Sequence, residues 1–260
     1  MDNSRWPDVT VVICTYNRPV EIRKTIDSML KNLRYPPEHL LWLIADDGTV
    51  GDYPNDVCEY ILARLPDADV SYTITERRGW GANVNKALKE AFGYADYVYF
   101  TEDDYLLLKP LDLRPYIAAM EVDQRIGLVR FGIAGHSLTC GLHELDISDW
   151  IPDYQENDSN NGYSGVGKIN MWYVDRISSR GPFSNYQYSN RPHLKHRRFH
   201  ETYRLYPEGL TLGETEEAMN RQMMAEMNLQ PYITCPANWT LWHYDHCGQS
   251  RQGTREDVHA

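Results

Sequence analysis

The stretch Val9-Thr10-Val11-Val12-Ile13-Cys14 is short, apolar and mostly β-branched. Such a run is typical of a parallel strand that is buried on both faces. It ends at three polar residues, Thr15-Tyr16-Asn17. Pro19 then favours the start of a helix. Apolar residues recur behind it at helical spacing, at Ile22, Ile26, Met29, Leu30 and Leu33.

The same alternation of strand and helix continues along the first half of the chain. Apolar runs predict strands at 40–45, 70–74 and 97–100, and helical spacing predicts helices over 57–65 and 84–92. This βαβαβαβ order favours an open, mainly parallel sheet with helices on both faces. Ligands bind such sheets outside the carboxyl ends of the strands. Polar clusters follow three of the predicted strands: Thr15-Tyr16-Asn17, Asp46-Asp47 and Glu102-Asp103-Asp104.

Length and composition exclude several classes of protein. The chain has 260 residues and a hydrophobic fraction of 42%, so wholesale disorder is excluded. Its net charge of −11 argues against bulk nucleic-acid binding. No stretch approaches the roughly 18 apolar residues of a membrane span, and the N-terminus lacks the apolar core of a signal peptide. The five scattered cysteines fit a reducing compartment, so we expect a cytoplasmic protein.

The second half of the chain has a less regular pattern. Residues 127–132 predict another strand, and a helix is expected after Gly213. Residues 152–168 are rich in Asn, Asp, Ser and Gly, which is typical of a loop. Residues 239–242 predict a Trp-rich strand that leads into His243.

One segment of this acidic chain is locally basic. Residues 191–204 contain five Lys or Arg residues and three His residues. Three interpretations stay open: a mobile loop that closes over a diphosphate through bidentate Arg contacts, a surface that recognises an anionic acceptor, and a solvated face.

The acidic triplet Glu102-Asp103-Asp104 follows directly after a predicted buried strand. Like charges at one site repel each other unless a cation compensates them. Mg²⁺ and Mn²⁺ prefer such oxygen ligands and commonly bridge carboxylates to substrate phosphates. An isolated acidic triplet is more often a solvated turn, but its place at a strand end of this topology favours a metal site.

The segment Asp46-Asp47-Gly48 also has two interpretations. Asp and Gly are ordinary turn formers, and a carboxylate here can also accept a hydrogen bond from a nucleobase ring nitrogen. Tyr16 is either a stacking platform for that base or a core tyrosine. Neither the glycine-rich dinucleotide fingerprint nor a P-loop occurs in the chain.

Four segments, taken in order, resemble the signatures of family-2 glycosyltransferases with the GT-A fold. They are Val11 to Pro19 (VVICTYNRP), Ile44 to Thr49 (IADDGT), Arg78 to Ala87 (RGWGANVNKA) and Phe100 to Asp104 (FTEDD). Beyond residue 110 the resemblance is weaker. There the segment GETEEAMNR, Gly213 to Arg221, is similar to the family's G-E-D-x-E-x-x-x-R segment, with Thr215 where many members have Asp.

The resemblance implies an α/β fold of the GT-A type, an open mixed sheet that is mainly parallel and flanked by helices. It also implies a nucleotide-sugar donor whose base packs on Tyr16 and whose ring nitrogen, usually of uracil, binds Asp47. Glu102 is then expected to contact the ribose or the sugar. The other donor-binding residues that we expect are Thr15, Asn17, Arg18, Asp46, Arg78, Asn83 and Asp103.

The resemblance further implies that Asp104 holds a divalent metal, Mn²⁺ or Mg²⁺. Many GT-A enzymes use a late histidine as an additional protein ligand, and His243 and His246 follow the predicted Trp-rich strand. Histidine is a common metal ligand. A structural or surface role is as well supported for either histidine taken singly.

The catalytic base is expected in the acceptor half of the chain. Glu214 stands at the head of a predicted helix, where the helix dipole favours a carboxylate. Its alternative role is that of a helix cap. Because Thr215 cannot replace the missing Asp, Glu214 is the first candidate, followed by Glu217 and Glu216.

Together these features predict a single domain, residues 1–260, with a nucleotide-sugar-binding half over 1–110 and an acceptor-binding and catalytic half over 111–260. The predicted reaction moves a sugar from a UDP-sugar to a hydroxyl of a glycan or other acceptor. It depends on a metal and, by resemblance, inverts the anomeric carbon. Two rivals are a non-catalytic nucleotide- or glycan-binding relative and a sugar-phosphate nucleotidyltransferase. The lack of a predicted membrane span leaves room for peripheral membrane contact.

Overall fold

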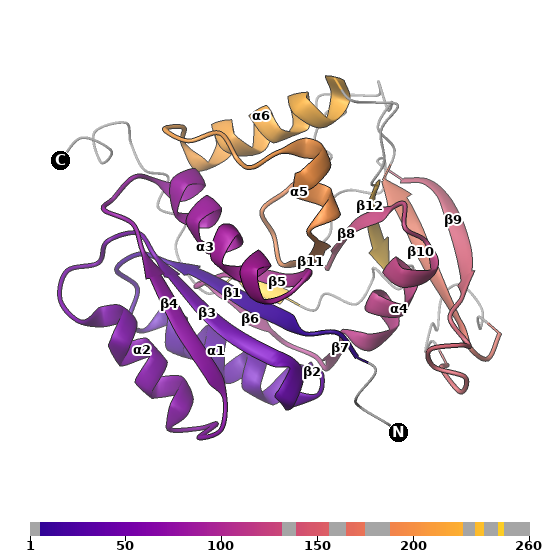
Figure 1. Ribbon diagram of the computed structural model, residues 1–260, viewed down its shortest axis with the longest axis horizontal. Helices are drawn as coiled ribbons and strands as arrows, with labels where there is room; N and C mark the ends of the chain where they lie inside the picture. Colours follow the sequence, from indigo (N-terminus) through magenta and orange to yellow (C-terminus); the bar gives the residue numbers. More distant parts are fainter. Residues whose placement is uncertain are drawn as a thin grey trace.

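The fold is built on one large sheet (Figure 1). The computed structural model describes residues 6–131, 139–155, 165–174, 188–225, 232–236 and 244–246. Nine strands in these segments form the sheet, in the order β4-β3-β1-β5-β11-β8-β12-β10-β9. Strands from both halves of the chain therefore share one sheet.

The first half forms the parallel part of the sheet, which confirms the predicted alternation. Its strands are β1 (Val9–Thr15), β3 (Leu40–Asp46), β4 (Asp69–Ile74) and β5 (Tyr97–Glu102). Neighbours among them pair in parallel, so their carboxyl ends meet at one edge of the sheet. All seven residues of β1 are buried, because β1 lies between β3 and β5 and is covered on both faces.

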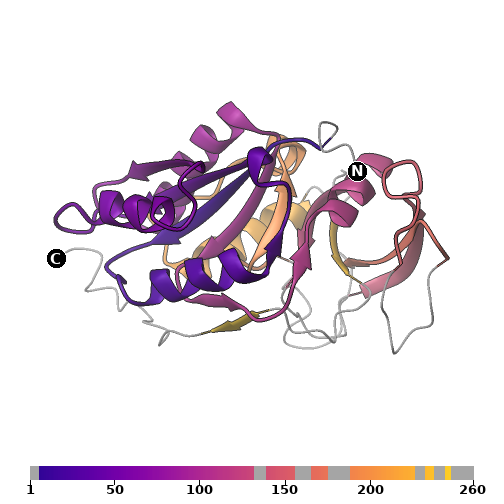
Figure 2. The ribbon, with the colours of Figure 1, turned by 90° about the horizontal axis from the view of Figure 1, so that it is seen from below.

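Helices cover both faces of this sheet (Figure 2). On one face lie α1 (Glu21–Asn32), α2 (Tyr53–Leu62) and α4 (Arg114–Val122), and on the other lie α3 (Trp80–Tyr94), α5 (Arg198–Tyr203) and α6 (Leu212–Ala225). Because side chains alternate along a strand, Val11 and Ile13 join the first core and Val12 joins the second. The predicted open mixed sheet flanked by helices is confirmed.

The second half adds mainly antiparallel strands. They are β8 (Ile126–Arg130), β9 (Thr139–Asp146), β10 (Lys168–Val174), β11 (His193–His196) and β12 (Tyr232–Pro236). β8 confirms the strand predicted at 127–132, and α6 confirms the helix expected after Gly213. The loop predicted over 152–168 reaches the first residue of β10, and its residues 156–164 lie outside the described residues. The Trp-rich strand predicted at 239–242 lies outside them as well.

Short elements complete the structure. β2 (Leu33–Arg34) pairs with β7 (Leu111–Asp112), and β6 (Tyr105–Leu107) pairs with β13 (Tyr244–His246). A short 3-10 helix, η2 (Pro37–His39), precedes β3. Within the described segments, no helix has both the length and the apolar character needed to cross a membrane.

The basic segment 191–204 belongs largely to the core. Its strand β11 lies between β5 and β8, and the side chains of His193 and Lys195 are fully buried. Lys195 donates a hydrogen bond to the Tyr206 hydroxyl (2.9 Å), and its ammonium lies 5.0 Å from the centre of the Phe100 ring. For these buried residues the predictions of a mobile loop, an anionic-acceptor surface and a solvated face are all wrong. The Lys195 side chain is surrounded by the Phe100 ring and the Tyr206 hydroxyl instead of by water.

The burial of Lys195 predicts a measurable pH dependence of stability. Burial lowers the pKa of Lys195 to about 7. Between about pH 7 and about pH 10 the unfolded chain therefore binds more protons than the folded chain, and the free energy of unfolding rises with pH. We expect Lys195→Met to flatten this rise, because methionine carries no proton. Urea unfolding at several pH values measures the slope.

The exposed Lys89 provides the control. Lys89→Met is expected to keep the wild-type slope. A Lys195→Met protein with the same slope as the Lys89→Met protein would contradict the buried, deprotonated state of Lys195.

Candidate active site

Asp103 connects the loop after β1 to the end of β5. Its carboxylate accepts hydrogen bonds from the Thr15 hydroxyl (2.8 Å), the Tyr16 backbone N–H (3.4 Å) and the Arg18 guanidinium (3.1 Å). The Thr25 hydroxyl, on α1, donates to the backbone carbonyl of Asp103 (2.7 Å). Burial raises the pKa of Asp103 to about 6, against the opposing effect of the Arg18 charge. Asp103 therefore fixes the positions of Thr15, Tyr16 and Arg18.

The positively charged Arg18 side chain lies between the carboxylates of Asp103 and Asp104. The same guanidinium nitrogen contacts Oδ1 of Asp103 and Oδ2 of Asp104. Both aspartates are 4% exposed, and oxygen ligands of this kind suit Mg²⁺ or Mn²⁺. No group of three or more His, Cys, Asp and Glu side chains within the described segments could hold a metal. A divalent cation fits here if a ligand supplies further oxygens.

Glu102 lies on the other side of β5, against the start of α3. Its carboxylate accepts a hydrogen bond from the indole N–H of Trp80 (2.7 Å). Burial and the nearby charge of Asp104 raise the pKa of Glu102 to about 8, although the Trp80 hydrogen bond lowers it. The Trp80 ring packs edge-on against Phe100 and Tyr206, with ring centres 6.0 Å and 5.0 Å away. The amino end of α3 therefore points at the acidic triplet, and such an end favours anions.

Asp46 shapes the turn that follows β3. Its carboxylate accepts hydrogen bonds from the backbone N–H groups of Gly48 (3.1 Å) and Thr49 (2.7 Å) and from the Thr49 hydroxyl (2.5 Å). Gly48 has a φ of +85°, and a Cβ there would lie 2.7 Å from the carbonyl oxygen of Thr75. The turn therefore requires glycine, and Asp46 serves the turn.

Asp47 holds the loop between β4 and α3. Its carboxylate accepts hydrogen bonds from the Thr75 hydroxyl (2.6 Å) and from the backbone N–H groups of Arg78 and Gly79 (3.1 Å each). In the same loop, Arg77 lies over the ring of Tyr16, 4.6 Å from its centre. Burial raises the pKa of Asp47, and its three hydrogen bonds oppose that shift. Tyr16 and Asp47, which were predicted to flank one pocket, thus both contact this loop.

The remaining predicted donor residues differ in position. Asn83 is 3% exposed, and its amide donates to the carbonyl of Ala45 (2.8 Å), so it fastens α3 to β3. Asn17, in the loop after β1, and Arg78, in the loop before α3, are exposed to solvent. Arg78 lies 3.3 Å from Glu208.

The two predicted catalytic acids occupy the outer side of α6. Glu214 accepts hydrogen bonds from the backbone N–H and the hydroxyl of Thr211 (2.9 Å each), as in a helix cap. Glu217 is 65% exposed at its side chain and pairs with Arg221 at 2.5 Å. Glu216, the acid between them, is half-buried and accepts a hydrogen bond from the backbone N–H of Asn190 (2.7 Å).

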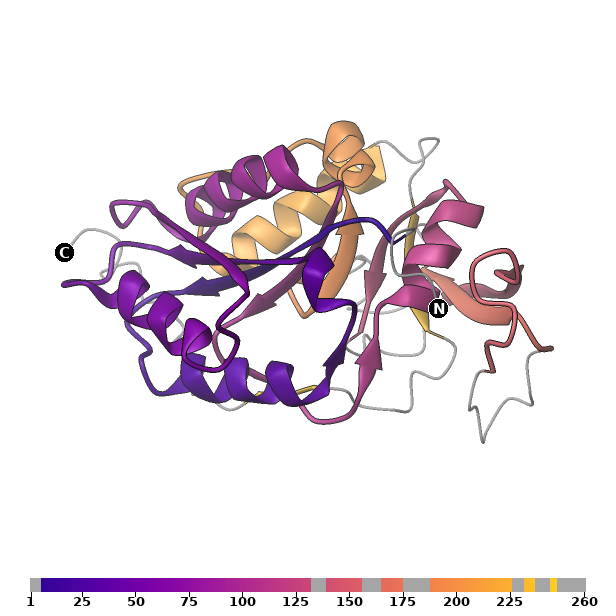
Figure 3. The ribbon, with the colours of Figure 1, turned by 60° about the horizontal axis from the view of Figure 1, so that its bottom comes forward.

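The predicted histidine ligands follow the Trp-rich segment. His243 lies outside the described residues. His246 belongs to β13, which runs antiparallel to β6 (Figure 3). In this pairing the backbone of His246 lies opposite Tyr105. β6 begins directly after Asp104, so the chain fold brings the β13 backbone beside the acidic triplet.

Three residues near the site escaped the sequence reasoning. Trp80 lies inside the motif Arg78 to Ala87, from which only its neighbours were selected, and Arg77 stands directly before that motif. Asn190 lies before a strand that was not predicted. Arg77 could have been found as the second member of the Arg77-Arg78 pair. Trp80 could have been found as an aromatic residue at a helix start.

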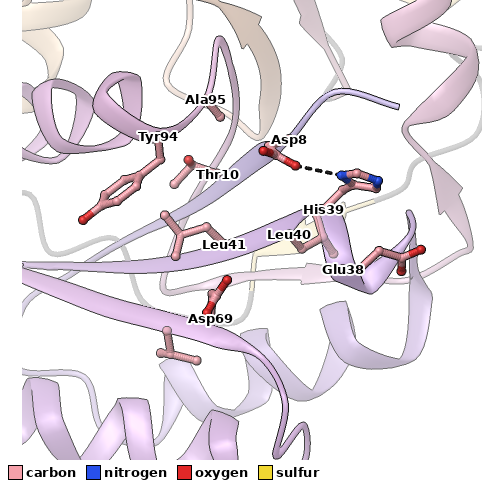
Figure 4. Close-up of a pocket in the computed structure, with 10 residues that line it drawn as sticks. Asp8, Thr10, Glu38, His39, Leu40, Leu41, Asp69, Tyr94 and Ala95 are labelled. Carbon is pink, nitrogen blue, oxygen red and sulfur yellow. Dashed lines mark hydrogen bonds and ion pairs between the residues drawn. The ribbon is translucent and has the colours of Figure 1, made fainter. Parts of the chain in front are cut away.

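A separate cleft of about 400 Å³ lies at the opposite edge of the sheet (Figure 4). Thr10 of β1 and the first two residues of β3 and of β4 line it, together with Asp8, His39 and Tyr94. Asp8 and His39 form an ion pair there at 2.7 Å. None of the predicted site residues lines this cleft, so it is distinct from the acidic site.

The sequence of this chain matches a known family. The model of glycosyl transferase family 2 matches residues 10–177. The chain belongs to this family. The match includes β1, the acidic triplet and the loop held by Asp47. No curated protein sequence matches the chain.

Solved structures share the fold of this family-2 chain. One is the mannosyltransferase PcManGT from Pyrobaculum calidifontis in complex with GDP-Man and Mn²⁺, with 17% identity and a TM-score of 0.54. Another is S. aureus TarS 1–349 in complex with UDP-GlcNAc, with 17% identity and a TM-score of 0.56. The matches cover 91% and 88% of this chain but 58% and 55% of those two chains. At this identity the likeness shows the fold.

The bonds made by Asp47 predict that it orders the loop in front of α3. In Asp47→Ala the N–H groups of Arg78 and Gly79 lose their carboxylate acceptor, and hydrogen bonds to a charged group contribute about 1.5–3 kcal/mol. We expect the peptide that contains both residues to exchange its amide hydrogens about 10- to 100-fold faster. Hydrogen exchange followed by mass spectrometry measures this rate.

Asp52→Ala is the matched control, because Asp52 is exposed and lies in the segment after the same strand. It is expected to leave the exchange of that peptide unchanged. An Asp47→Ala protein with wild-type exchange would show that Asp47 does not hold the loop.

Proposed function

We propose that this chain transfers a sugar from a nucleotide-diphosphate sugar to a hydroxyl group, with a divalent metal. One observation carries the proposal: Asp103 and Asp104, both buried, converge on a single cation position beside β1 and β5. The family membership supports glycosyl transfer over the nucleotidyl-transfer rival.

The donor is proposed to be a UDP-sugar. Tyr16 offers a ring face for the base, and Asp47 lies in contact with the same loop. Among the structural neighbours, TarS is bound to UDP-GlcNAc or UDP, and PcManGT is bound to GDP-Man. These complexes support a nucleotide-sugar donor for this chain.

The diphosphate leaving group needs positive charge, because negative charge develops there as the sugar departs. Asp104 and, with it, Asp103 would hold Mn²⁺ or Mg²⁺, and such a metal neutralises diphosphate oxygens. Arg18, which pairs with both carboxylates, would become available to the phosphates if a metal replaced it there, and the amino end of α3 would add its dipole. Inversion at the anomeric carbon is an expectation from the family.

This proposal predicts metal-dependent binding of UDP. Asp104→Asn replaces an anionic ligand by a neutral amide, so we expect UDP affinity in Mn²⁺ to fall by about 10- to 100-fold. The affinity for UDP in EDTA should be the same in both proteins. Isothermal titration with UDP, with and without Mn²⁺, measures both.

Asp67→Asn, at an exposed turn, serves as the control and should bind UDP as the wild type does. Equal UDP affinity in Mn²⁺ and in EDTA for the wild type would contradict the metal site. No affinity for UDP, with GDP bound instead, would contradict the uracil assignment.

The rival of a non-catalytic binder rests on Thr215. This residue is fully buried, and its hydroxyl donates to the carbonyl of Thr211 (2.9 Å), so it cannot act as a base. Release of UDP from UDP-sugars, with and without acceptor sugars, distinguishes the two. Tight binding without any release would support the binder.

A further inference from the structure

Helix α6 carries three acidic residues near its start, Glu214, Glu216 and Glu217, and they point to different sides of the helix. Each residue of an α-helix advances by about 100°. Met219 and Met223 are buried and define the side of α6 that faces the sheet. Glu216 lies about 60° from Met219, whereas Glu214 and Glu217 lie about 140° and about 160° away. Glu216 is therefore the acid of this turn that faces inward.

Glu216 is connected to the end of β5 through β11. The backbone N–H of Asn190 donates to Glu216, and Asn190 stands three residues before His193, which pairs with Phe100 of β5, two residues before Glu102. In agreement with this, the pKa of Tyr105 is raised by burial and by the charges of Glu102, Asp104 and Glu216, and the charge of Arg191 lowers it. Glu216 also adds to the raised pKa of Glu102.

One hydrogen bond and one nearby charge stabilise the ionised form of the Glu216 carboxylate. The backbone N–H of Asn190 donates to its Oε1 at 2.7 Å. Burial raises the pKa of Glu216, while this hydrogen bond and the charge of Arg130 lower it. A base works best when its pKa is close to the operating pH.

Asn190, whose backbone bonds to Glu216, provides a second observation that points to a ligand near Glu216. Its side chain is 3% exposed, and neither its oxygen nor its nitrogen forms a hydrogen bond with any described residue. Leaving such a group unpaired costs about 1–3 kcal/mol. Unpaired buried groups in native proteins often belong to functional sites.

We propose that Glu216 removes the proton from the acceptor hydroxyl and that the side-chain amide of Asn190 hydrogen-bonds the sugar or acceptor beside it. This inference rests on the proposed glycosyl transfer. The proton moves to the Glu216 carboxylate, and the acceptor oxygen forms a bond to the anomeric carbon. The bond from that carbon to the diphosphate oxygen breaks, and its electron pair leaves with the diphosphate.

The first experiment compares Glu216→Gln with Glu217→Gln and Glu214→Gln. A panel of UDP- and GDP-sugars is offered with Mn²⁺ and simple sugar acceptors, and nucleoside diphosphate release is followed. We expect Glu216→Gln to lower kcat by about 10²- to 10⁴-fold and to bind UDP with wild-type affinity. The two outer variants should keep wild-type kcat within a few-fold.

Chemical rescue distinguishes a base from a structural group. Glu216→Ala leaves space at the carboxylate position, and added formate should restore part of the lost rate. Formate should not stimulate the wild type. A Glu216→Gln protein with wild-type kcat, or a loss of kcat that formate leaves unchanged in Glu216→Ala, would overturn the assignment.

Asn190→Leu tests the second half of the proposal. Removing an unpaired buried amide should leave the Tm equal or higher, while the KM for the acceptor rises by about 10-fold or more. An unchanged KM in a folded Asn190→Leu protein would overturn the role of Asn190.

Failure of the inference differs from failure of the proposed function. If the wild type releases nucleoside diphosphate and Glu216→Gln does so equally, only the base assignment is wrong. If the wild type releases none from any sugar nucleotide of the panel, the proposed transfer is wrong, and the role of Glu216 is wrong with it.

Discussion

The buried carboxylate of Asp103 holds the loop after β1 against the end of β5. Through Thr15, Tyr16 and Arg18 it fixes the loop after β1, and through its carbonyl it contacts α1 at Thr25. The parallel register of β1 with β5 brings these groups to one edge of the sheet. The ion pair between Arg18 and Asp104 depends on this arrangement, because Asp103 holds the loop that carries Arg18.

Burying several carboxylates at one strand end requires compensation. Asp103 and Asp104 share the charge of Arg18, and Glu102 accepts a hydrogen bond from Trp80 and has a raised pKa. A divalent cation would compensate the same charges more strongly than one guanidinium. It would also leave Arg18 available for the phosphates of a ligand. The clustered carboxylates at the end of β5 therefore explain both the need for a compensating cation and the proposed use of a metal in the reaction.

The first half of the fold could be predicted from the sequence because its signals are local. Buried β-branched runs alternate with amphipathic helices, and the rule that ligands bind at carboxyl ends selected the acidic triplet. β11 could not be predicted in this way, since Lys195 and His193 are polar residues that aromatic neighbours from distant segments accommodate.

The site was predictable in its location but less so in its individual roles. Asp46 and Asp47 were selected as ligand contacts, which stays a prediction, but the sequence did not predict that their carboxylates hold a turn and a loop. On α6, motif alignment favoured Glu214 and Glu217, whereas the spacing of Met219 and Met223 points to Glu216. A motif identifies a segment, but helical phase determines which of its side chains faces the sheet.

In the proposed enzyme, a metal and a nucleotide-diphosphate sugar meet at the end of β5. A crystal structure of the chain with Mn²⁺ and a UDP-sugar, with Mn²⁺ located by its anomalous signal, tests it most directly. We predict Mn²⁺ bound to Asp104 and the diphosphate, with the base near Tyr16 and Arg18 moved from Asp104. Mn²⁺ or nucleotide bound elsewhere, for example in the cleft beside Asp8 and His39, would contradict the account.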